Sequence, residues 1–590
     1  MGLDRPGSLP SHLADLGPVP EVALLDANGQ LQTLASKGLG HATILSLIYA
    51  TCQDAQGCPL ATQTLHRLAR SLKASPDVTP RVHFLSISFD RAHDTPAVLD
   101  RYARPFRLPN IDWSFTVPAS EEALKTLLEG LGQSVEQIPG QQGFSHHLRV
   151  YLVDDKGRIR NSYSASNLDP SLMRQDLDAL MKPLETPTQN RPSQGEVRPG
   201  DDRTGYETTR YQTHAAALDR RQGPARTLWP ARTEDLLGLP KFPWTRQDAP
   251  RPAAIALGRK LFFDRRLSAN GTLSCALCHV PEQGFTSQEQ RTSVGIEGRI
   301  VRRNAPSLLN VGLLGPLFHD GREDRLENQV WGPLLAPQEM GNVSIGQVLN
   351  RLRDLPDYRG MFEAAFHRGA TTDTVGSALA AYERTLMAGG SPFDRWYFAG
   401  NADSLSVEAQ RGFELFRGKA GCGVCHRVDK GQALFTDQAY HNTGIGYRAA
   451  MGEPTEAAQI QLAPGVFAVL AADRIGSVSA PLPPDLGRYE VTQNPKDRWK
   501  YRTPGLRNVA LTPPYMHDGS LPTLESVVAF YRAGGFANPD LDPNIKTLPL
   551  TDEEASDLVA FLRSLTAPAV ESLVLDAFTI PIGNPSAERP

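Results

Sequence analysis

Two short cysteine motifs carry the clearest chemical signal in the sequence. Each reads C-x-x-C-H, and together they comprise Cys275, Cys278, His279, Cys422, Cys425 and His426. This spacing is the attachment signature of c-type haem, since two thiols about one helical turn apart can add to two porphyrin vinyl groups while the adjacent imidazole lies beneath the iron. A zinc site near Cys278 and Cys425, or two buried disulfides, is the alternative. We therefore predict two covalently bound c-type haems.

The other two cysteines form a separate close pair. Cys52 and Cys58 follow directly after the apolar run 42–50, at a predicted turn from strand to helix. Thioredoxin-like folds keep their reactive cysteines at such a turn. The pair therefore predicts a redox or metal-binding loop.

Composition narrows the class of protein. The 590 residues predict three to four domains, and 40% hydrophobic with 21% charged residues describes a globular chain. The formal charge of −4 provides no net field for nucleic acid or an anionic membrane, so we expect no nucleic-acid partner. The longest apolar run, 42–50, is far shorter than the roughly 20 residues of a membrane span. The first residues do not read as a secretory signal, yet covalent haem attachment normally takes place outside the cytoplasm, and on that ground we expect a periplasmic location.

The first part of the chain alternates strand and helix patterns. Apolar runs at 42–50 and 81–90 flank an amphipathic stretch at 60–74, which predicts a βαβ unit. Residues 147–159 read as two strands joined by an Asp-Lys-Gly turn, and 169–181 as a helix. We expect a thioredoxin-like α/β domain over 19–181.

The rest of the chain is mainly helical. Residues 182–240 lack sustained periodicity and predict a linker. Helices are predicted at 252–267, 344–352, 374–387, 406–416 and 551–565. Each haem motif follows a helix with a Leu-Phe pair, which indicates a duplicated cytochrome c unit divided into domains 241–405 and 406–567.

A family resemblance appears once these motifs are read together. Residues 241–567 resemble the bacterial di-haem cytochrome c peroxidase and MauG family through LGRKLFFDRRLSANGTLSCALCH, RRNAPSLLNV, FHDGREDRLENQVWGPLLAPQEM, SPFDRWYFAG, HNTGIG and YRTPGLRNVALTPPYMHDGS. The resemblance implies a peroxidatic first haem, an electron-transfer second haem, and Gln329 and Glu339 as the distal pair that handles hydrogen peroxide. It implies two kinds of partner: a small electron donor, such as cytochrome c or a cupredoxin, or a protein substrate.

Three positions depart from the peroxidase pattern. The loop 293–303 lacks the histidine that caps the first haem in members requiring reductive activation, so we expect an open haem. His319 stands where the family usually has a bridging Trp, and Trp331 is a nearby candidate relay with core packing as its ordinary role. Tyr531 occupies the position of the second axial ligand, with Met516 as the competing ligand. A phenolate stabilises ferric and higher iron states, whereas a thioether favours ferrous iron.

Two further metal sites are implied by resemblance. The peroxidase family implies a calcium ion held by the side chain of Asn304 and the backbone oxygens of Thr512 and Pro514. Residues 19–181 resemble the Sco/SenC family, which implies a copper site at Cys52, Cys58 and His146. This chain has five residues between the cysteines where that family has three, so thiol–disulfide exchange, a structural disulfide, and His147 in place of His146 stay open.

The sequence thus predicts a multidomain chain, with an N-terminal α/β thioredoxin-like domain followed by a mainly α di-haem cytochrome c module. The expected function is peroxide reduction at the first haem, with oxidising equivalents shared with a second haem ligated by Tyr531. The rival functions are a copper-delivery or thiol–disulfide protein whose haems supply electrons to Cys52 and Cys58, and a passive electron carrier with two six-coordinate haems.

Overall fold

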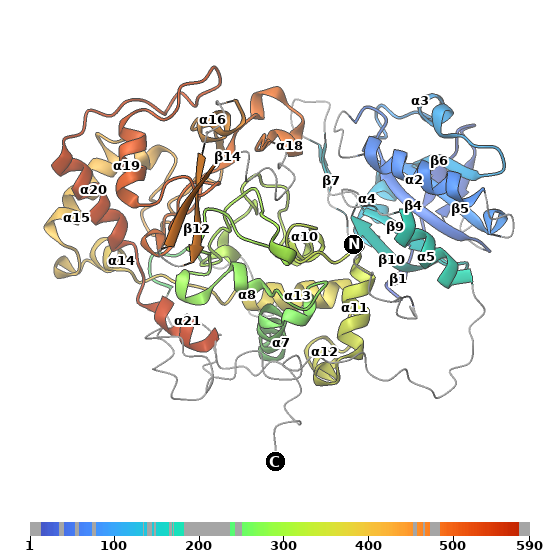
Figure 1. Cartoon of the computed structure of the whole chain (residues 1–590), viewed down its shortest axis with the longest axis horizontal. Helices are drawn as coiled ribbons and strands as arrows, with labels where there is room; N and C mark the ends of the chain where they lie inside the picture. The colour runs from blue at the N-terminus through green and yellow to red at the C-terminus, as the bar shows by residue number, and fades with distance from the viewer. Residues whose placement is uncertain are drawn as a thin grey trace, which may run out of the picture.

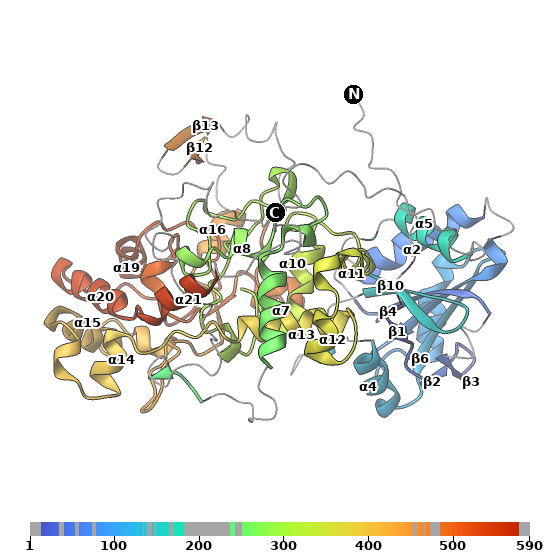
Figure 2. The same cartoon turned by 90° about the horizontal axis from the view of Figure 1, so that it is seen from below.

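The computed structural model describes residues 13, 15–34, 40–52, 58–73, 78–131, 133, 135–137, 144–146, 149–164, 168, 170–181, 236–241, 251–451, 457–463, 466–471 and 484–577. The predicted linker 182–240 lies outside the described residues except for 236–240. The described residues form three hydrophobic cores. The N-terminal α/β domain lies at one end of the molecule, the second haem domain at the other, and the first haem domain between them (Figures 1 and 2).

An eight-stranded mixed sheet forms the centre of the N-terminal domain, in the order β1-β10-β9-β4-β5-β6-β2-β3. β4 (Ala42–Ile48), β5 (Val82–Ser88) and β6 (Asp112–Pro118) are parallel. All seven residues of β4 are buried, which explains its continuous apolar sequence. The other strands are β1 (Gly17–Pro18), β2 (Ala23–Leu25), β3 (Leu31–Thr33), β9 (Arg149–Val153), β10 (Arg158–Ser164), and the separate hairpin β7 (Val135–Gln137) and β8 (Phe144–His146).

Among the described residues, four α-helices accompany this sheet: α2 (Cys58–Leu72), α3 (Pro96–Ala103), α4 (Glu121–Gly130) and α5 (Pro170–Met181). α2 connects the parallel strands β4 and β5, which confirms the predicted βαβ unit. The side chains of Thr95 and Ser120 cap α3 and α4 by accepting backbone N–H bonds. The predicted thioredoxin-like α/β fold is confirmed.

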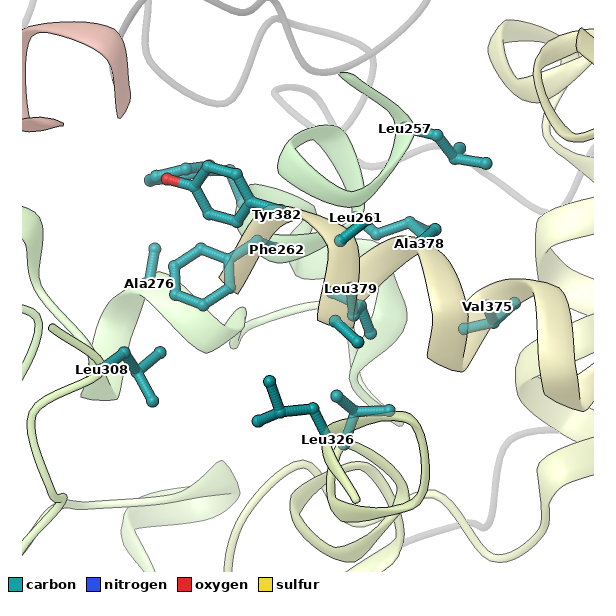
Figure 3. Close-up of a cluster of buried hydrophobic side chains, with 14 of the residues drawn as sticks. Leu257, Leu261, Phe262, Ala276, Leu308, Leu326, Val375, Ala378, Leu379 and Tyr382 are labelled. Atoms are coloured by element: carbon teal, nitrogen blue, oxygen red, sulfur yellow. The ribbon is translucent and has the colours of Figure 1, made fainter. Parts of the chain in front are cut away.

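The first haem domain is built around two crossing helices, α7 (Pro252–Phe263) and α13 (Thr372–Glu383). Their apolar side chains belong to one core (Figure 3). A β-carbon on Gly258 would overlap the carbonyl oxygen of Ala378, so the crossing requires glycine. The other helices here are α8 (Cys275–Cys278), α9 (Leu326–Gln329), α10 (Trp331–Leu335), α11 (Ile345–Asp354) and α12 (Met361–Phe366).

The second haem domain repeats this construction. α15 (Val407–Arg417) crosses α20 (Asp552–Ser564), and a β-carbon on Gly412 would overlap the carbonyl oxygen of Asp557. The Leu-Phe helices therefore share a glycine crossing, in agreement with the expected duplication. The remaining elements are β11 (Tyr440–His441), β12 (Ala457–Ala463), β13 (Val466–Ala471), β14 (Tyr501–Arg502), α14 (Pro392–Tyr397), α16 (Ile445–Met451), α18 (Tyr489–Thr492), α19 (Leu524–Arg532) and α21 (Ala569–Ala577).

Two predicted helices end four residues early: the helix predicted at 374–387 ends at Glu383, and the one predicted at 252–267 ends at Phe263. The pattern at 252–267 predicts a single helix, but α7 stops at Phe263 because Asp264 leaves the helical conformation. The Asp264 side chain accepts the N–H of Arg266 and pairs with its guanidinium, which caps a separate 3-10 turn over Arg265–Leu267. A side-chain cap thus replaces the continued helix.

The last described helix returns to the first haem domain. α21 follows α20 in sequence, yet its apolar residues belong to the core that contains α7 and α13. Asp576 of α21 is paired with Arg259 of α7 in that core. Among the described helices no single one is long and apolar enough to cross a membrane; α20 and α21, bent by 51°, meet that criterion only as a pair.

Candidate di-haem site

The first four residues of the first C-x-x-C-H motif form α8, and His279, the last residue of the motif, directly follows this helix. The Nδ1 atom of His279 lies 3.0 Å from the carbonyl oxygen of Phe285, a buried residue with a left-handed φ of 56°. With an Nδ1–H donated to this carbonyl, Nε2 remains available to an iron ion. Burial lowers the pKa of His279, which favours the neutral imidazole that a metal requires.

The histidine of the second motif is oriented by the same kind of hydrogen bond. His426 follows the 3-10 turn Cys422–Val424 and Cys425, and its Nδ1 lies 2.7 Å from the carbonyl oxygen of Phe435. Phe435 is also buried, with a φ of 55°. Burial again lowers the pKa of the imidazole. The donors at both motifs therefore fit a covalently attached haem.

Glu339 follows α10 and lies among the groups around the first pair of thiols. Burial raises the pKa of Cys278 to about 11, and the charge of Glu339 adds to this rise. Burial is also the largest cause of the raised pKa of the Cys275 thiol, and the charge of Glu339 contributes to that rise. Burial also raises the pKa of Glu339 itself, while the positive charge of Arg322 opposes that rise. A carboxylate beside both attachment thiols, with a raised pKa, is suited to exchange protons there.

The histidine-free loop 293–303 contacts the turn that holds Glu339. The N–H of Ile296 donates to the Glu339 carbonyl at 2.9 Å, and Arg299 donates to the Pro337 carbonyl at 3.0 Å. A β-carbon on Gly295 would overlap the carbonyl oxygen of Gln338. The loop is therefore held directly against the carboxylate turn.

The structure places the other two predicted residues of this site on neighbouring short helices. Gln329 is the last residue of α9 and is partly exposed. Its backbone N–H donates to the carbonyl oxygen of Arg325 at 2.9 Å. Its proposed role with peroxide stays a prediction. Trp331 of α10 is buried in the core of the first haem domain, in agreement with its packing role.

Tyr531 of α19 faces the second attachment motif. Burial raises the pKa of its hydroxyl, and charge on the Cys422 and Cys425 sulfurs raises it further, which indicates that the phenol lies close to both. Met516 instead lies in a turn closed by the N–H of Gly519 at 3.2 Å. The carbonyl of the next residue, His517, accepts the N–H of Asn304 in the first haem domain at 2.7 Å. The assignment of Tyr531 rather than Met516 as the ligand of the second haem stays a prediction.

A histidine between two carboxylates lies beside the same thiols, and sequence analysis missed it. His441 Nδ1 lies 2.6 Å from Asp542 and Nε2 3.0 Å from Asp437. A hydrogen bond with Cys425, followed by those with the two carboxylates, raises the pKa of His441 to about 10. The ligand atoms of Cys425, Asp437 and His441 lie within 4.8 Å of one another, but a Cys425 bonded to haem is no longer a thiolate ligand. The sequence signal that could have identified His441 is its place as the first residue of the HNTGIG motif.

Ring side chains line the contact between the haem domains. His319 Nε2 lies 2.9 Å from the carbonyl oxygen of Asn304, and burial lowers the pKa of His319 to about 3, so the ring is neutral. The charge of His517 also lowers the pKa of His319. The His517 ring stacks on that of Tyr501, with ring centroids 3.5 Å apart. Tyr501 and His517 were not singled out from sequence, although both lie in motifs of the family resemblance.

The expected calcium donors lie on segments that meet at this contact. Asn304 donates through its side chain to the Arg291 carbonyl at 2.9 Å and through its backbone to His517. Gln288 donates to the carbonyl of Leu511, the residue before Thr512, at 2.6 Å. The peptide bond into Pro514 is cis. Calcium coordination by Asn304, Thr512 and Pro514 stays a prediction.

The N-terminal cysteines lie at the end of β4. The backbone N–H of Cys52 donates to Tyr49 at 3.2 Å, and Cys58 is the buried first residue of α2. Burial raises the pKa of Tyr102 to about 12, and charge on Cys58 and Cys52 adds to this rise, which places both sulfurs beside one phenol. His146 is the last residue of β8, paired in backbone register with Val135. His147 lies outside the described residues, and the copper site stays a prediction.

Comparison with known proteins identifies both parts. Residues 252–403 match the family model described as di-haem cytochrome c peroxidase, and residues 19–182 match the SCO1/SenC model. The methylamine utilization protein MauG of Methylorubrum extorquens is 36% identical over 328 residues, covering 55% of this chain and 81% of that protein. The chain belongs to the di-haem cytochrome c peroxidase and MauG family.

Two more matches complete the comparison. The cytochrome-c peroxidase IdrP1 of Denitromonas iodatirespirans is 36% identical over 353 residues, covering 58% of this chain and 89% of that protein. The solved structure of a MauG-like protein associated with microbial copper homeostasis is 32% identical, with a TM-score of 0.45, covering 56% of this chain and 96% of that one. This di-haem oxidoreductase therefore carries a Sco/SenC-like domain in front of its peroxidase module.

In this di-haem oxidoreductase we expect Arg322→Gln to alter the pH dependence of peroxide reduction. The Arg322 charge lowers the pKa of Glu339, so its removal allows that pKa to rise. If Glu339 acts as a base, activity is present above its pKa and is lost as the pH falls through it. The acidic limb of kcat/KM should therefore move to higher pH in Arg322→Gln, whereas Arg322→Lys should stay near the wild type. An unchanged limb in both variants would contradict this assignment.

Proposed function

We propose that this protein reduces hydrogen peroxide at its first haem and shares the two oxidising equivalents with a second haem ligated by Tyr531. The observation that carries the proposal is the position of Glu339: its backbone carbonyl accepts the N–H of Ile296 in the histidine-free loop 293–303 at 2.9 Å, and burial raises the pKa of its side chain. The equivalents then oxidise a small electron donor, such as cytochrome c or a cupredoxin, or a protein substrate. Covalent haem attachment favours a periplasmic location.

The haem, when bound through Cys275 and Cys278, supplies an iron centre that accepts peroxide and provides electrons to it. His279 would hold that iron through Nε2, because its Nδ1 hydrogen-bonds to the carbonyl oxygen of Phe285. The Glu339 carboxylate accepts the proton of one peroxide oxygen and returns it to the other, which leaves as water. The Gln329 amide orients peroxide without exchanging a proton.

The loop 293–303 supports activity without prior reduction. It contains no histidine that could occupy the distal side, and it is bonded to the Glu339 turn through Ile296 and Arg299. A conformational step that removes a side chain from iron is therefore not required. This distinguishes the proposed enzyme from a passive carrier, in which both irons would be six-coordinate.

Ferric-state EPR of the haem-loaded protein tests this proposal. We expect a high-spin signal from the first haem in the resting protein, and its disappearance on addition of peroxide. Peroxide consumption matched to oxidation of reduced cytochrome c would identify an electron donor, whereas covalent change in a partner would identify a protein substrate. Two low-spin haems that do not respond to peroxide would contradict the proposal.

A further inference from the structure

The N-terminal domain is docked on the first haem domain through buried contacts. Leu16 packs against the cores of both domains. The side-chain oxygen of Asn161 on β10 accepts the backbone N–H of Gly346 on α11 at 3.1 Å, and this bond is buried. A β-carbon on Gly346 would come within 2.6 Å of the same oxygen. The two domains therefore share a packed interface in addition to the linker.

The docked side includes the segment that carries His146. β8, which ends at His146, packs against α18 of the haem module, and Figure 1 shows the β7 hairpin strand reaching from the N-terminal domain towards α18. Three residues further, Arg149 is buried at the start of β9. Burial raises the pKa of Glu323 in the haem module to about 7, and the charge of Arg149 opposes this rise. The docked segment, β8 together with Arg149 of β9, thus lies against the haem module.

Strand register places the cysteine pair at the same end of the sheet. β9 pairs antiparallel with β4, and Val150 lies opposite Ser46. The first residues of β9 therefore adjoin the last residues of β4, and Cys52 follows β4 by four residues. Cys58 lies with Cys52 beside Tyr102. The dithiol is consequently on the sheet end that carries the docked segment.

Residues of the haem module that form ion pairs with one another lie next to the docked segment. Glu490 of α18 pairs with Arg302 at 2.7 Å, and Glu323 directly follows Arg322, whose charge acts on Glu339. Arg303, next to Arg302, pairs with Asp485 at 2.6 Å. The docked segment therefore contacts groups that belong to the surroundings of the first haem.

We propose that the Cys52/Cys58 dithiol is an internal substrate of the di-haem module, oxidised to a disulfide by the equivalents that peroxide provides. This inference rests on the proposed function and names its substrate. The two thiols lose two electrons and two protons and form one S–S bond, while hydrogen peroxide gains both and gives two molecules of water. One peroxide thus yields one disulfide, and no other reactant is needed.

The test uses the full haem-loaded chain, treated with chelator and with both N-terminal thiols reduced. One equivalent of peroxide is added, the reaction is quenched with an alkylating reagent, and mass spectrometry measures the Cys52–Cys58 disulfide. We expect nearly one disulfide per peroxide, formed about 10²-fold faster than in haem-loaded Glu339→Gln, where only direct peroxide–thiol chemistry remains. Equal rates in the two proteins would overturn the inference.

A second arm separates this inference from the proposed function. If the wild type consumes peroxide with reduced cytochrome c while its dithiol stays reduced, the inference fails and the peroxidase function stands. If neither donor nor dithiol is oxidised, the proposed function itself fails.

The docking contacts provide matched variants. Arg149→Glu should slow disulfide formation by about tenfold or more without slowing peroxide reduction by cytochrome c, because opposed charges at an interface are replaced by like charges. Arg104→Glu, on an exposed face of the same domain, is the control and should behave as the wild type. Gly346→Ala disturbs the interface from the haem side if Arg149→Glu does not fold. Unchanged disulfide formation in folded interface variants would contradict the inference.

Discussion

Glu339→Gln should lower kcat/KM for hydrogen peroxide by about 10² to 10⁴-fold, the usual contribution of a positioned acid–base group. The amide has nearly the same shape but cannot accept a proton, so peroxide should still enter without being cleaved. Haem content and the resting ferric spectrum should be unchanged, because no attachment residue is altered. Stopped-flow measurement of peroxide consumption checks the result.

A matched substitution controls for local disturbance. Glu297 lies in the loop against the Glu339 turn, is exposed, and pairs with Arg299. Glu297→Gln should therefore retain peroxide reduction. If Glu339→Gln kept wild-type kcat/KM, Glu339 would not be the proton-transfer group.

Tyr531→Met should raise the reduction potential of the second haem. Replacing an anionic oxygen donor by a thioether removes stabilisation of ferric iron, and axial ligands set haem potentials over about 0.8 V, so a rise on the order of 0.1 V or more is expected. The second haem should then store an oxidising equivalent less well. Spectroelectrochemical titration of both haems measures the change.

Met516→Leu is the corresponding control for the competing ligand. Its turn contacts the first haem domain through the neighbouring His517, so the potential of the second haem should change little. The opposite pattern, a shift in Met516→Leu and none in Tyr531→Met, would assign the ligand to Met516.

Local patterns were sufficient to predict much of the fold. The buried run at β4, the amphipathic α2 and the capping box of Thr551 and Glu554 each reflect short-range rules, and the corresponding elements are present. The haem attachment residues follow a fixed spacing, so they could be read directly. The early end of α7 at Asp264 was missed because a side-chain cap competed with helical periodicity.

Long-range contacts could not be read from spacing. Arg322 acts on Glu339 from another loop, and His441 lies between Asp437 and Asp542, which are far apart along the chain. Tyr501 and His517 stack because β14 and the turn that holds His517 converge. A single sequence gives the residue types at such positions but does not determine which of them meet.

The path of α21, the last described helix, determines how the enzyme can be divided into parts. Because α21 completes the core of the first haem domain after the chain has already built the second, the first half is not a contiguous stretch of polypeptide, whereas the buried core residues of the second lie within 393–565. Truncation before residue 569 would expose the α7 side of the first half and leave the partner of Arg259 missing. Assembly of the peroxidatic half must therefore await synthesis of α21, and a first half expressed without this helix should be a poor substitute for the intact chain.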